Sequence, residues 1–264
     1  MMGRDDGARP VKTILVIGIG AGDPDYVTMQ AVKALNRVDV FFILDKGAEK
    51  AELIALRKEI CRRYITGDRH RFVEAESPPW DRASPDYLHT VDGLNEQKKA
   101  VFERLIAQEL ADGECGAFLV WGDPALYDST IRILDMVQAG GLAFGYEVIP
   151  GISSLQALAA KHRIPLTRIG GSLTVTTARK LREGLPKDAD SVAVMLDGAT
   201  AFSAFAAQDI EIFWGAYVGL PDEILMSGKL CDVADDIAQA RSKARAEKGW
   251  IMDSYLLRKG SGET

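Results

Sequence analysis

The fold of this 264-residue chain is decided near its start, where residues 11–24 read VKTILVIGIGAGDP. The nearly continuous apolar and β-branched run from Val11 to Ile17 is typical of a strand that is buried on both faces of a parallel sheet. A glycine-rich loop follows it, and a helix is expected from about 25 to 36. This order of strand, loop and helix predicts an α/β fold.

The same order continues through the first 160 residues. Further strands are expected at 38–44, 71–74, 117–121 and 146–149, with helices at 51–64, 95–110, 128–139 and 152–163. The proline-interrupted stretch 76–89 is expected to be a loop. After Pro165, strands are expected at 172–176, 191–196, 210–214, 224–230 and 250–257, with helices at 178–183, 200–208 and 233–248. We therefore expect two α/β lobes, residues 11–160 and a strand-rich lobe at 165–258.

Composition excludes several classes of protein. The hydrophobic fraction of 47% and the charged fraction of 27% are ordinary for a soluble globular protein and exclude collagen-like and disordered chains. No window approaches the roughly 20 apolar residues of a membrane helix, and residues 1–10 lack the apolar core of a signal peptide. Cys61, Cys115 and Cys231 are widely spaced, so we expect reduced thiols in a cytoplasmic protein and no metal site. The net charge of −6 argues against nucleic acid as the main partner.

The first glycine loop invites comparison with a dinucleotide-binding fingerprint. Its glycines are spaced G-x-G-x-G at 18, 20 and 22, one residue tighter than the G-x-G-x-x-G of that fingerprint. Asp23 would stand where a pyrophosphate lies, and its charge would repel one. Asp45 ends the second strand, where an acidic residue binds a ribose in such proteins, so NAD remains an alternative. A tight turn without any ligand is a further alternative.

A second loop of the same kind favours a different ligand. Residues 121–127 read WGDPALY and also follow a buried strand. Two such loops at the carboxyl ends of parallel strands would face the crevice where ligands bind in open α/β sheets. Glycine backbone and carboxylates suit a ligand with positive and hydrogen-bond-donating groups. S-adenosyl-methionine, with an ammonium, a sulfonium and ribose hydroxyls, fits this description better than a nucleotide phosphate.

Several segments, in order along the chain, carry a resemblance to a known family. They are IGIGAGDPDYVT at 17–28, WGDPALYDS at 121–129, VIPGISSLQALAA at 148–160 with IPLT at 164–167, VAVMLDG at 192–198 and GAYVGLPDEILMSGKL at 215–230. With these segments the chain resembles the S-adenosyl-methionine-dependent tetrapyrrole (precorrin/uroporphyrinogen) methylases of cobalamin and sirohaem biosynthesis. The resemblance implies two α/β lobes with an S-adenosyl-methionine cleft between them, a small tetrapyrrole substrate and a homodimer.

Within the family, the chain is most similar to the deacetylating branch. The segments MLDGATAF at 195–202, WGAYVGLPDEIL at 214–225 and GWIMDSYLLRK at 249–259 carry this narrower resemblance. It implies methylation of precorrin-5 at C-1, with water-dependent release of the acetyl group as acetate, to give precorrin-6A. Another precorrin or uroporphyrinogen C-methyltransferase, an NAD-dependent dehydrogenase and a non-catalytic ligand-binding protein are the alternatives. The chain departs from the family pattern at Ala21, where a proline is common, and at Ser153-Ser154, where Thr-Ala is common.

The resemblance also implies a set of site residues. The expected cofactor-binding residues are Ala21, Trp121, Gly122, Asp123, Leu126, Ser153, Ser154, Leu196, Tyr217 and Val218. Leu126 and Leu196 have core packing as their alternative role, Ser153 has helix capping and Asp123 has turn formation. For deacetylation, Asp45 is the expected base toward water and Tyr127 the expected donor to the acetyl oxygen.

The segment 57–71 reconciles an acidic chain with an anionic substrate. It holds the basic residues Arg57, Lys58, Arg62, Arg63, Arg69 and Arg71 against Glu59 and Asp68. A solvated helix face is one interpretation of this cluster. We expect one or two of its arginines, with Arg69 and Arg71 as candidates, to meet substrate carboxylates, because the guanidinium group pairs with carboxylates through two hydrogen bonds.

Overall fold

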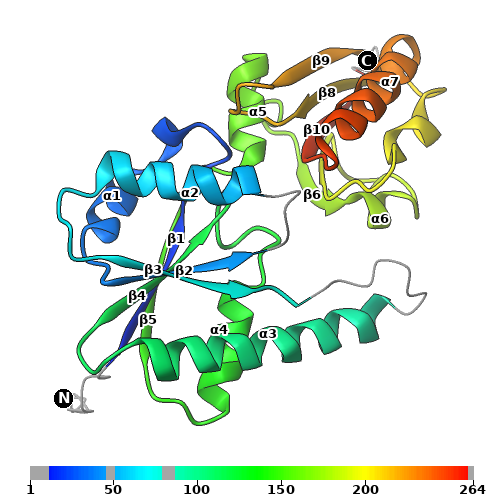
Figure 1. Cartoon of the computed structure of the whole chain (residues 1–264). Helices are drawn as coiled ribbons and strands as arrows, with labels where there is room; N and C mark the ends of the chain where they lie inside the picture. The colour runs from blue at the N-terminus through cyan, green and yellow to red at the C-terminus, as the bar shows by residue number, and fades with distance from the viewer. Residues whose placement is uncertain (1–11, 46–50, 79–86, 261–264) are drawn as a thin grey trace, which may run out of the picture. The chain divides into compact units, whose positions relative to one another are not determined.

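The chain divides into two units in the computed structural model (Figure 1), which describes residues 12–45, 51–78 and 87–260. Unit 1 comprises the chain up to Gly20 together with Pro24–Ile152. Unit 2 comprises Ala21–Asp23 and the chain from Ser153 onward. Each unit has its own five-stranded sheet.

The sheet of unit 1 is parallel throughout. Its strands are β1 (Thr13–Gly18), β2 (Val40–Asp45), β3 (Arg71–Glu76), β4 (Cys115–Val120) and β5 (Gly145–Ile149), in the order β3-β2-β4-β1-β5. In register, Gly18 lies beside Val120, and Ile17 lies beside Ile149. Because the strands are parallel, the segments that follow β1, β4 and β5 leave the sheet at the same edge.

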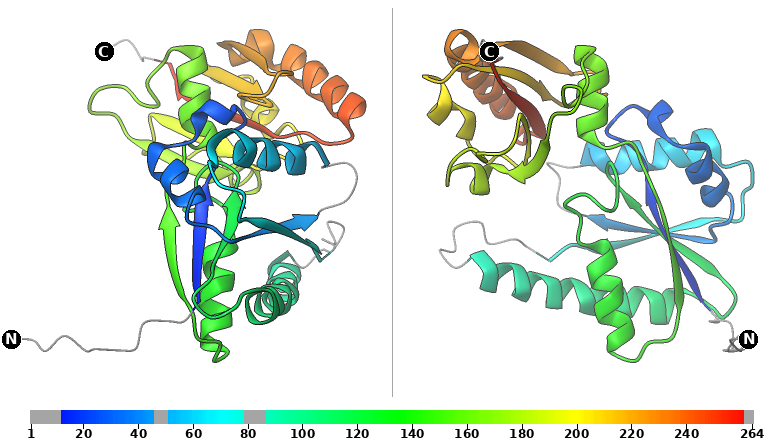
Figure 2. Two further views of the ribbon diagram at one scale, coloured as in Figure 1. Left: turned by 60° about the vertical axis from the view of Figure 1, so that its left-hand side comes forward. Right: turned by 180° about the vertical axis from the view of Figure 1, so that it is seen from behind.

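Helices cover both faces of this sheet (Figures 1 and 2). Helices α1 (Met29–Leu35) and α2 (Ala51–Tyr64) lie on one face, and α3 (Tyr87–Glu109) and α4 (Thr130–Ala139) lie on the other. Alternate residues of β1 serve the two cores: Leu15 and Ile17 pack with α1 and α2, while Ile14 and Val16 pack with α3 and α4. Full burial of each such side chain contributes about 1.5–3 kcal/mol, which explains why this strand is apolar at nearly every position.

The sheet of unit 2 is mixed. Its strands are β6 (Leu173–Thr177), β7 (Ser191–Met195), β8 (Ile210–Ala216), β9 (Ile224–Lys229) and β10 (Asp253–Lys259), in the order β6-β7-β10-β8-β9. Only the β6–β7 pair is parallel among these pairings. The helical segments are α5 (Ser154–His162), α6 (Ala178–Leu181), the 3-10 helix η3 (Ala201–Phe205) and α7 (Leu230–Lys248). Trp214 and Tyr255 are fully buried in this unit.

The structure differs from the sequence-based expectation at several places. Helix α3 begins at Tyr87, eight residues before the expected start at 95 and within the stretch 76–89 that was expected to be a loop; residues 79–86 of that stretch lie outside the described ranges. The helix expected at 25–36 is a 3-10 turn, η1 (Pro24–Tyr26), followed by α1, because the Thr28 hydroxyl accepts a hydrogen bond from the Ala31 amide at 3.1 Å and starts a new helix. The helix expected at 200–208 is the short η3. The division falls at Ile152/Ser153 and not at 160–165, because α5 packs on β8 and β10 of unit 2.

No helix within the described ranges is long and apolar enough to cross a membrane.

Candidate functional site

The carboxyl ends of β1 and β4 form the point where a ligand crevice is expected in such a sheet. These two strands are neighbours, yet β1 leads into α1 on one face of the sheet and β4 leads into α4 on the opposite face. Where the connections from adjacent parallel strands diverge in this way, the loops separate and leave room for a ligand. The segments that follow β1 and β4 here contain the two Gly-Asp-Pro sequences, at 22–24 and 122–124.

Four glycines bring the segments at and beyond these strand ends into backbone contact. Gly20 and Gly122 pair as an isolated antiparallel bridge, in which the Gly122 amide donates to the Gly20 carbonyl at 2.8 Å. A Cβ on Gly18 would lie 2.6 Å from the Gly151 nitrogen, and one on Gly151 would lie 2.1 Å from the Gly122 oxygen. Any side chain at 18 or 151 would therefore force these segments apart.

Asp123 holds this arrangement together through both carboxylate oxygens. Its Oδ1 accepts a hydrogen bond from the Ala125 amide at 2.8 Å, and its Oδ2 accepts one from the Gly151 amide at 2.8 Å. The Leu126 amide donates to the Asp123 carbonyl at 3.1 Å and completes the turn. The turn-forming role considered for Asp123 is thus present, and the carboxylate also ties the second loop to the segment after β5.

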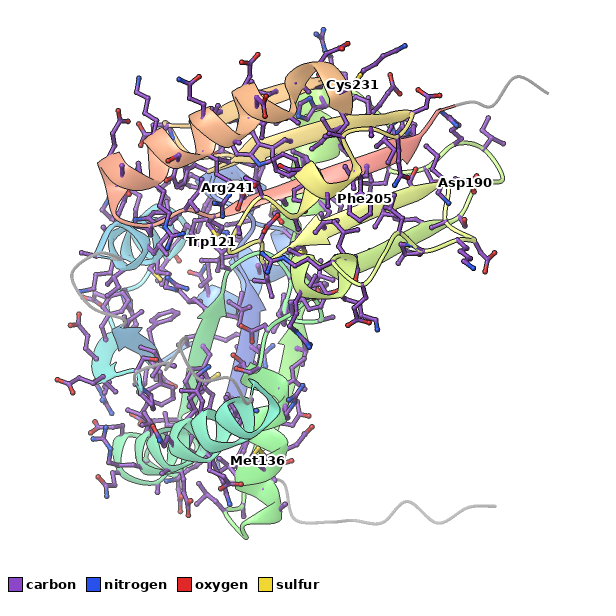
Figure 3. All side chains as sticks on the ribbon, turned by 90° about the vertical axis from the view of Figure 1, so that its right-hand side faces the viewer. Trp121, Met136, Asp190, Phe205, Cys231 and Arg241 are labelled. Carbon is purple, nitrogen blue, oxygen red and sulfur yellow. The ribbon has the colours of Figure 1, made fainter. Side chains whose placement is uncertain are left out.

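Two aromatic residues of the second loop have features that hydrophobic packing does not explain. The buried indole Nε1 of Trp121 (labelled in Figure 3) has no hydrogen-bond acceptor among the described residues. Tyr127 has a φ of 54° and is 46% exposed. Partial burial raises the pKa of its phenol, so the group is neutral at physiological pH. A free N–H and a protonated phenol are both available as donors.

In unit 2, Leu196 directly follows β7 and is held in an unusual conformation. Its φ is 57° and it is 62% exposed, which removes core packing as its role. The next residue, Asp197, is buried. The Asp197 carboxylate accepts hydrogen bonds from the Ala199 and Ala201 amides and from the Tyr255 hydroxyl, each at 2.9 Å.

A buried ion pair supports the same turn. Arg241 of α7 (Figure 3) pairs through Nε with Asp253 Oδ2 at 2.9 Å, and its guanidinium also donates to the Asp197 carbonyl. The Trp214 indole donates to the same Asp253 oxygen at 3.1 Å. Burial raises the pKa of Asp253, while Arg241 opposes this shift. These hydrogen bonds join β8, β10 and α7 to the turn that follows β7.

The segment after β8 is fixed by its backbone and by one phenol. Tyr217 has a φ of 51°, its amide donates to the Met252 carbonyl at 2.9 Å, and its hydroxyl donates to the Trp250 carbonyl at 2.6 Å. A Cβ on Gly22 would lie 2.7 Å from the Val218 oxygen, so the segment Ala21–Asp23, of which Ala21 and Gly22 are buried, packs against this turn. The Tyr217 ring is structural, and its carbonyl accepts a hydrogen bond from the Leu220 amide at 2.8 Å, so the amide and the carbonyl of this residue are both hydrogen-bonded within unit 2.

Ser153 caps helix α5. Its hydroxyl accepts from the Gln156 amide at 3.4 Å, and the Gln156 side chain accepts from the Ser153 amide at 2.8 Å, which forms a reciprocal capping box. The capping role considered for Ser153 is therefore present. Ser154 is the first residue of the helix.

The expected site residues fall into two groups, one in each unit. Unit 1 brings Trp121, Gly122, Asp123, Leu126 and Tyr127 together at the carboxyl edge of its sheet, where Asp45 ends β2. The Asp45 side chain lies outside the described part of the chain. Unit 2 holds Ala21, Ser153, Ser154, Leu196, Tyr217 and Val218.

The basic segment 57–71 does not act as one patch. Arg62 and Arg63 pair with Glu59, and Lys58 pairs with Glu74, in exposed ion pairs of the kind that contribute little to stability. Arg71 begins β3, at the edge of the sheet opposite to the glycine loops, and pairs with Glu109 at 3.4 Å. Arg57 alone within this segment reaches the carboxyl end of β4, through a hydrogen bond from Nε to the Leu119 carbonyl at 3.1 Å.

The Arg241–Asp253 pair is not among the expected interactions, although the sequence carries a signal for it. Buried positions of α7 recur at Ala234, Ile237, Arg241 and Ala244, so the arginine lies on the apolar stripe of an otherwise polar helix. A charged residue on such a stripe requires a buried partner. Nothing in the local sequence indicates that this partner is Asp253. The described residues contain no cluster of three or more potential metal ligands.

Comparisons with known proteins show the family to which the chain is similar. Residues 13–234 match the family described as tetrapyrrole (corrin/porphyrin) methylases. A curated protein from Sinorhizobium sp., named precorrin-6A synthase [deacetylating], is 50% identical over 252 residues, which cover 95% of this chain and 97% of the relative.

Solved structures resemble the chain along nearly its whole length. A cobalamin-synthesis-related protein (CobF) from Corynebacterium diphtheriae is 35% identical, with a TM-score of 0.81 over 94% of this chain and 99% of that protein. A uroporphyrin-III C-methyltransferase from Thermus thermophilus, crystallised with S-adenyl homocysteine, shares the fold at 15% identity, with a TM-score of 0.59 over 93% of this chain and 92% of that protein.

Proposed function

Because this chain belongs to the family of tetrapyrrole (corrin/porphyrin) methylases, we propose that it methylates precorrin-5 at C-1 and releases the acetyl group as acetate, giving precorrin-6A. The chain is an S-adenosyl-methionine-dependent methyltransferase of cobalamin biosynthesis. The observation that carries the narrower proposal is the 50% identity to a precorrin-6A synthase [deacetylating] over 95% of the chain.

The described residues fit S-adenosyl-methionine at both groups of expected positions. This methyl donor supplies a methyl group on a sulfonium, whose sulfur keeps the bonding electrons as the methyl carbon bonds to a nucleophilic carbon. In unit 1 the unpaired Trp121 N–H needs an acceptor, and in unit 2 the exposed, left-handed Leu196 has no packing role within the described residues. We propose that Ala21, Trp121, Gly122, Asp123, Leu126, Ser153, Ser154, Leu196, Tyr217 and Val218 bind it.

Positioning is the main contribution that these residues make to methyl transfer. Holding two reactants in the correct geometry can supply on the order of 7–11 kcal/mol of barrier reduction. A rigid backbone is suited to this task. Asp123 fixes the second loop of unit 1, and the Asp197–Arg241–Asp253 network fixes the turn at Leu196 in unit 2.

Deacetylation needs a base for water and a donor for the acetyl oxygen. We assign the base to Asp45, at the end of β2, and the donor to Tyr127, whose phenol stays protonated at physiological pH. The carboxylate takes a proton from water as the water oxygen bonds to the acetyl carbon. The bond from that carbon to the macrocycle then breaks, its electron pair stays with the macrocycle, and acetate leaves.

The test combines binding with product analysis. We expect calorimetry to show binding of S-adenosyl-methionine and none of NAD, and incubation with precorrin-5 to release one acetate per methyl transferred. Methylation without acetate would indicate another precorrin or uroporphyrinogen C-methyltransferase.

The roles of Asp45 and Tyr127 are tested by conservative variants. Asp45→Asn should bind S-adenosyl-methionine as the wild type does and release acetate about a hundredfold or more slowly. Tyr127→Phe should slow the same step less, because it removes only a donor. Asp68→Asn, at an exposed position of unit 1, is the matched control. Unchanged acetate release by Asp45→Asn would remove its role as the base.

We further propose that the enzyme is cytoplasmic and homodimeric. The free thiols Cys61, Cys115 and Cys231 support a reducing compartment, and light scattering tests the dimer.

A further inference from the structure

Arg57 is a cation with unused donors at the carboxyl end of β4. From the middle of α2, its Nε donates to the Leu119 carbonyl at 3.1 Å and its Nη1 donates to the Leu53 carbonyl at 2.9 Å. These neutral acceptors leave the charge without a carboxylate in direct contact, and Nη2 donates to no group among the described residues. Burial lowers the pKa of this guanidinium, although the group stays charged, as arginine does in proteins generally.

Lys98 approaches the same loop from the opposite face of the sheet. It projects from α3, and its Nζ donates to the Ser129 hydroxyl at 3.2 Å. Its nearest described acceptor is thus also neutral. Burial lowers the pKa of this ammonium group as well.

The two cations share one nearby carboxylate. Asp128 is the acidic residue whose charge acts on both Arg57 and Lys98, and it is exposed, with Oδ1 accepting from the Thr130 amide at 2.7 Å. Asp123, earlier in the same loop, has both carboxylate oxygens occupied by backbone amides. Arg57 contacts Leu119 and Lys98 contacts Ser129, so two partly buried cations lie at the two ends of the segment 119–129, which contains the second loop, in a chain whose net charge is −6.

We propose that Arg57 and Lys98 form a carboxylate-binding subsite beside the second loop, and that it holds one acidic side chain of the tetrapyrrole. This inference rests on the proposed function for the identity of the substrate. A carboxylate fits because the remaining N–H groups of a guanidinium match its two oxygens, and because Lys98 adds a second charge. The subsite would orient the macrocycle relative to Trp121 and Tyr127, which lie on the same loop.

The experiment compares charge-removing variants with matched controls. Steady-state kinetics with precorrin-5 and calorimetry with S-adenosyl-methionine are measured for the wild type, Arg57→Gln, Arg57→Lys, Lys98→Gln and the double glutamine variant. The controls are Arg62→Gln and Lys99→Gln, which remove one charge from the same two helices. We expect KM for precorrin-5 to rise about ten- to hundredfold in Arg57→Gln, less in Arg57→Lys, and about tenfold in Lys98→Gln.

Two patterns support a shared subsite. In the first, the Kd of S-adenosyl-methionine stays within about twofold of the wild-type value in every variant. In the second, KM for precorrin-5 rises less in the double variant than the product of the two single-variant rises, because both cations bind the same carboxylate. A KM within about twofold of the wild-type value in both single variants, with S-adenosyl-methionine binding intact, would overturn the subsite. Equal loss of affinity for precorrin-5 and for S-adenosyl-methionine would also overturn it, because a structural defect affects both.

A separate binding experiment distinguishes failure of the subsite from failure of the proposed reaction. Uroporphyrin III, a tetrapyrrole bearing many carboxylates, is titrated by fluorescence quenching against the same variants. If the wild type binds it but does not turn over precorrin-5, the proposed reaction fails while weaker uroporphyrin binding by the glutamine variants still supports the subsite. If Arg57→Gln does not fold, Lys98→Gln alone decides the outcome.

Discussion

Left-handed backbone at non-glycine residues marks the candidate site. Among the described residues, Tyr127, Arg163, Leu196 and Tyr217 have φ between 51° and 57°. Arg163 ends α5, a position where this conformation is common. The other three follow β4, β7 and β8, and each is among the expected site residues. Such conformations cost of order 1–3 kcal/mol and persist only where the surroundings enforce them, so their location is itself an argument for function.

Leu196 permits a direct test of this argument. Because Leu196 is 62% exposed and adopts a φ of 57°, Leu196→Gly relieves strain while losing little packing. We expect the free energy of unfolding to stay unchanged or rise by about 1 kcal/mol, as measured by urea denaturation, while the affinity for S-adenosyl-methionine falls severalfold.

Leu196→Ala is the matched control, because it removes the same side chain and retains the strain. It should lose affinity without gaining stability. A glycine variant that is less stable than the alanine variant would contradict the assignment of strain to this residue.

The residue types at the site were predictable from sequence, and their geometry was not. Two Gly-Asp-Pro loops after buried strands indicated which segments meet. The capping box of Ser153 and the turn of Asp123 follow from local rules. The exposure of Leu196 and the contact of Arg57 with Leu119, 62 residues away, depend on long-range packing that no local pattern records.

At the scale of elements, α7 is attached to the rest of unit 2 by a buried ion pair as well as by apolar packing. The side chains of Arg241 and Asp253 are 7% and 3% exposed. Charges removed from water to this degree are costly unless they are paired and hydrogen-bonded. Here the Trp214 indole and the Asp197 carbonyl provide the additional hydrogen bonds.

Removing the cation should destabilise the fold in a manner that depends on pH. Arg241→Met leaves Asp253 buried without its partner, and we expect a loss of about 3–5 kcal/mol near pH 7 by urea denaturation. Burial already raises the pKa of Asp253 in the wild type, and losing Arg241 raises it further. A carboxyl whose pKa is higher in the folded than in the unfolded state favours folding when protonated, so stability falls as pH rises from the unfolded value near 3.9.

The deficit of Arg241→Met relative to the wild type should therefore shrink as the pH is lowered toward 4. Arg245→Met, at an exposed position of the same helix, should cost less than about 0.5 kcal/mol. A deficit independent of pH would show that lost packing, and not the unpaired carboxylate, is its cause.

The alternation of strands and helices was the most predictable level of structure, and the ends of elements were the least. Helix α2 has its expected bounds of 51–64. The prediction of one continuous helix at 25–36 was wrong, because the Thr28 hydroxyl caps a new helix that begins at Met29. The parallel sheet of unit 1 follows from the apolar runs, whereas the antiparallel pairing of β10 with both β7 and β8 joins strands far apart in sequence.

At the scale of the whole molecule, the proposed cofactor-binding residues are drawn from both units. Trp121, Gly122, Asp123 and Leu126 belong to unit 1, whereas Ala21 and the residues from Ser153 onward belong to unit 2. The chain passes from one unit to the other at Gly20/Ala21, at Asp23/Pro24 and at Ile152/Ser153. Each of these crossings lies within or next to a proposed contact.

This distribution predicts how S-adenosyl-methionine affects the stability of the enzyme. A ligand that binds only the folded protein stabilises it by about 2.7 kcal/mol at a hundred times its Kd. If the proposed contacts are correct, amide hydrogen exchange should slow on binding in residues 121–127 of unit 1 and also in residues 196–201 and 217–219 of unit 2. NAD at the same concentration is the control and should slow neither group. Slower exchange confined to one unit would contradict the contact set, because a ligand held by one unit stabilises the other only through chain connections, whereas contacts in both oppose local opening of each.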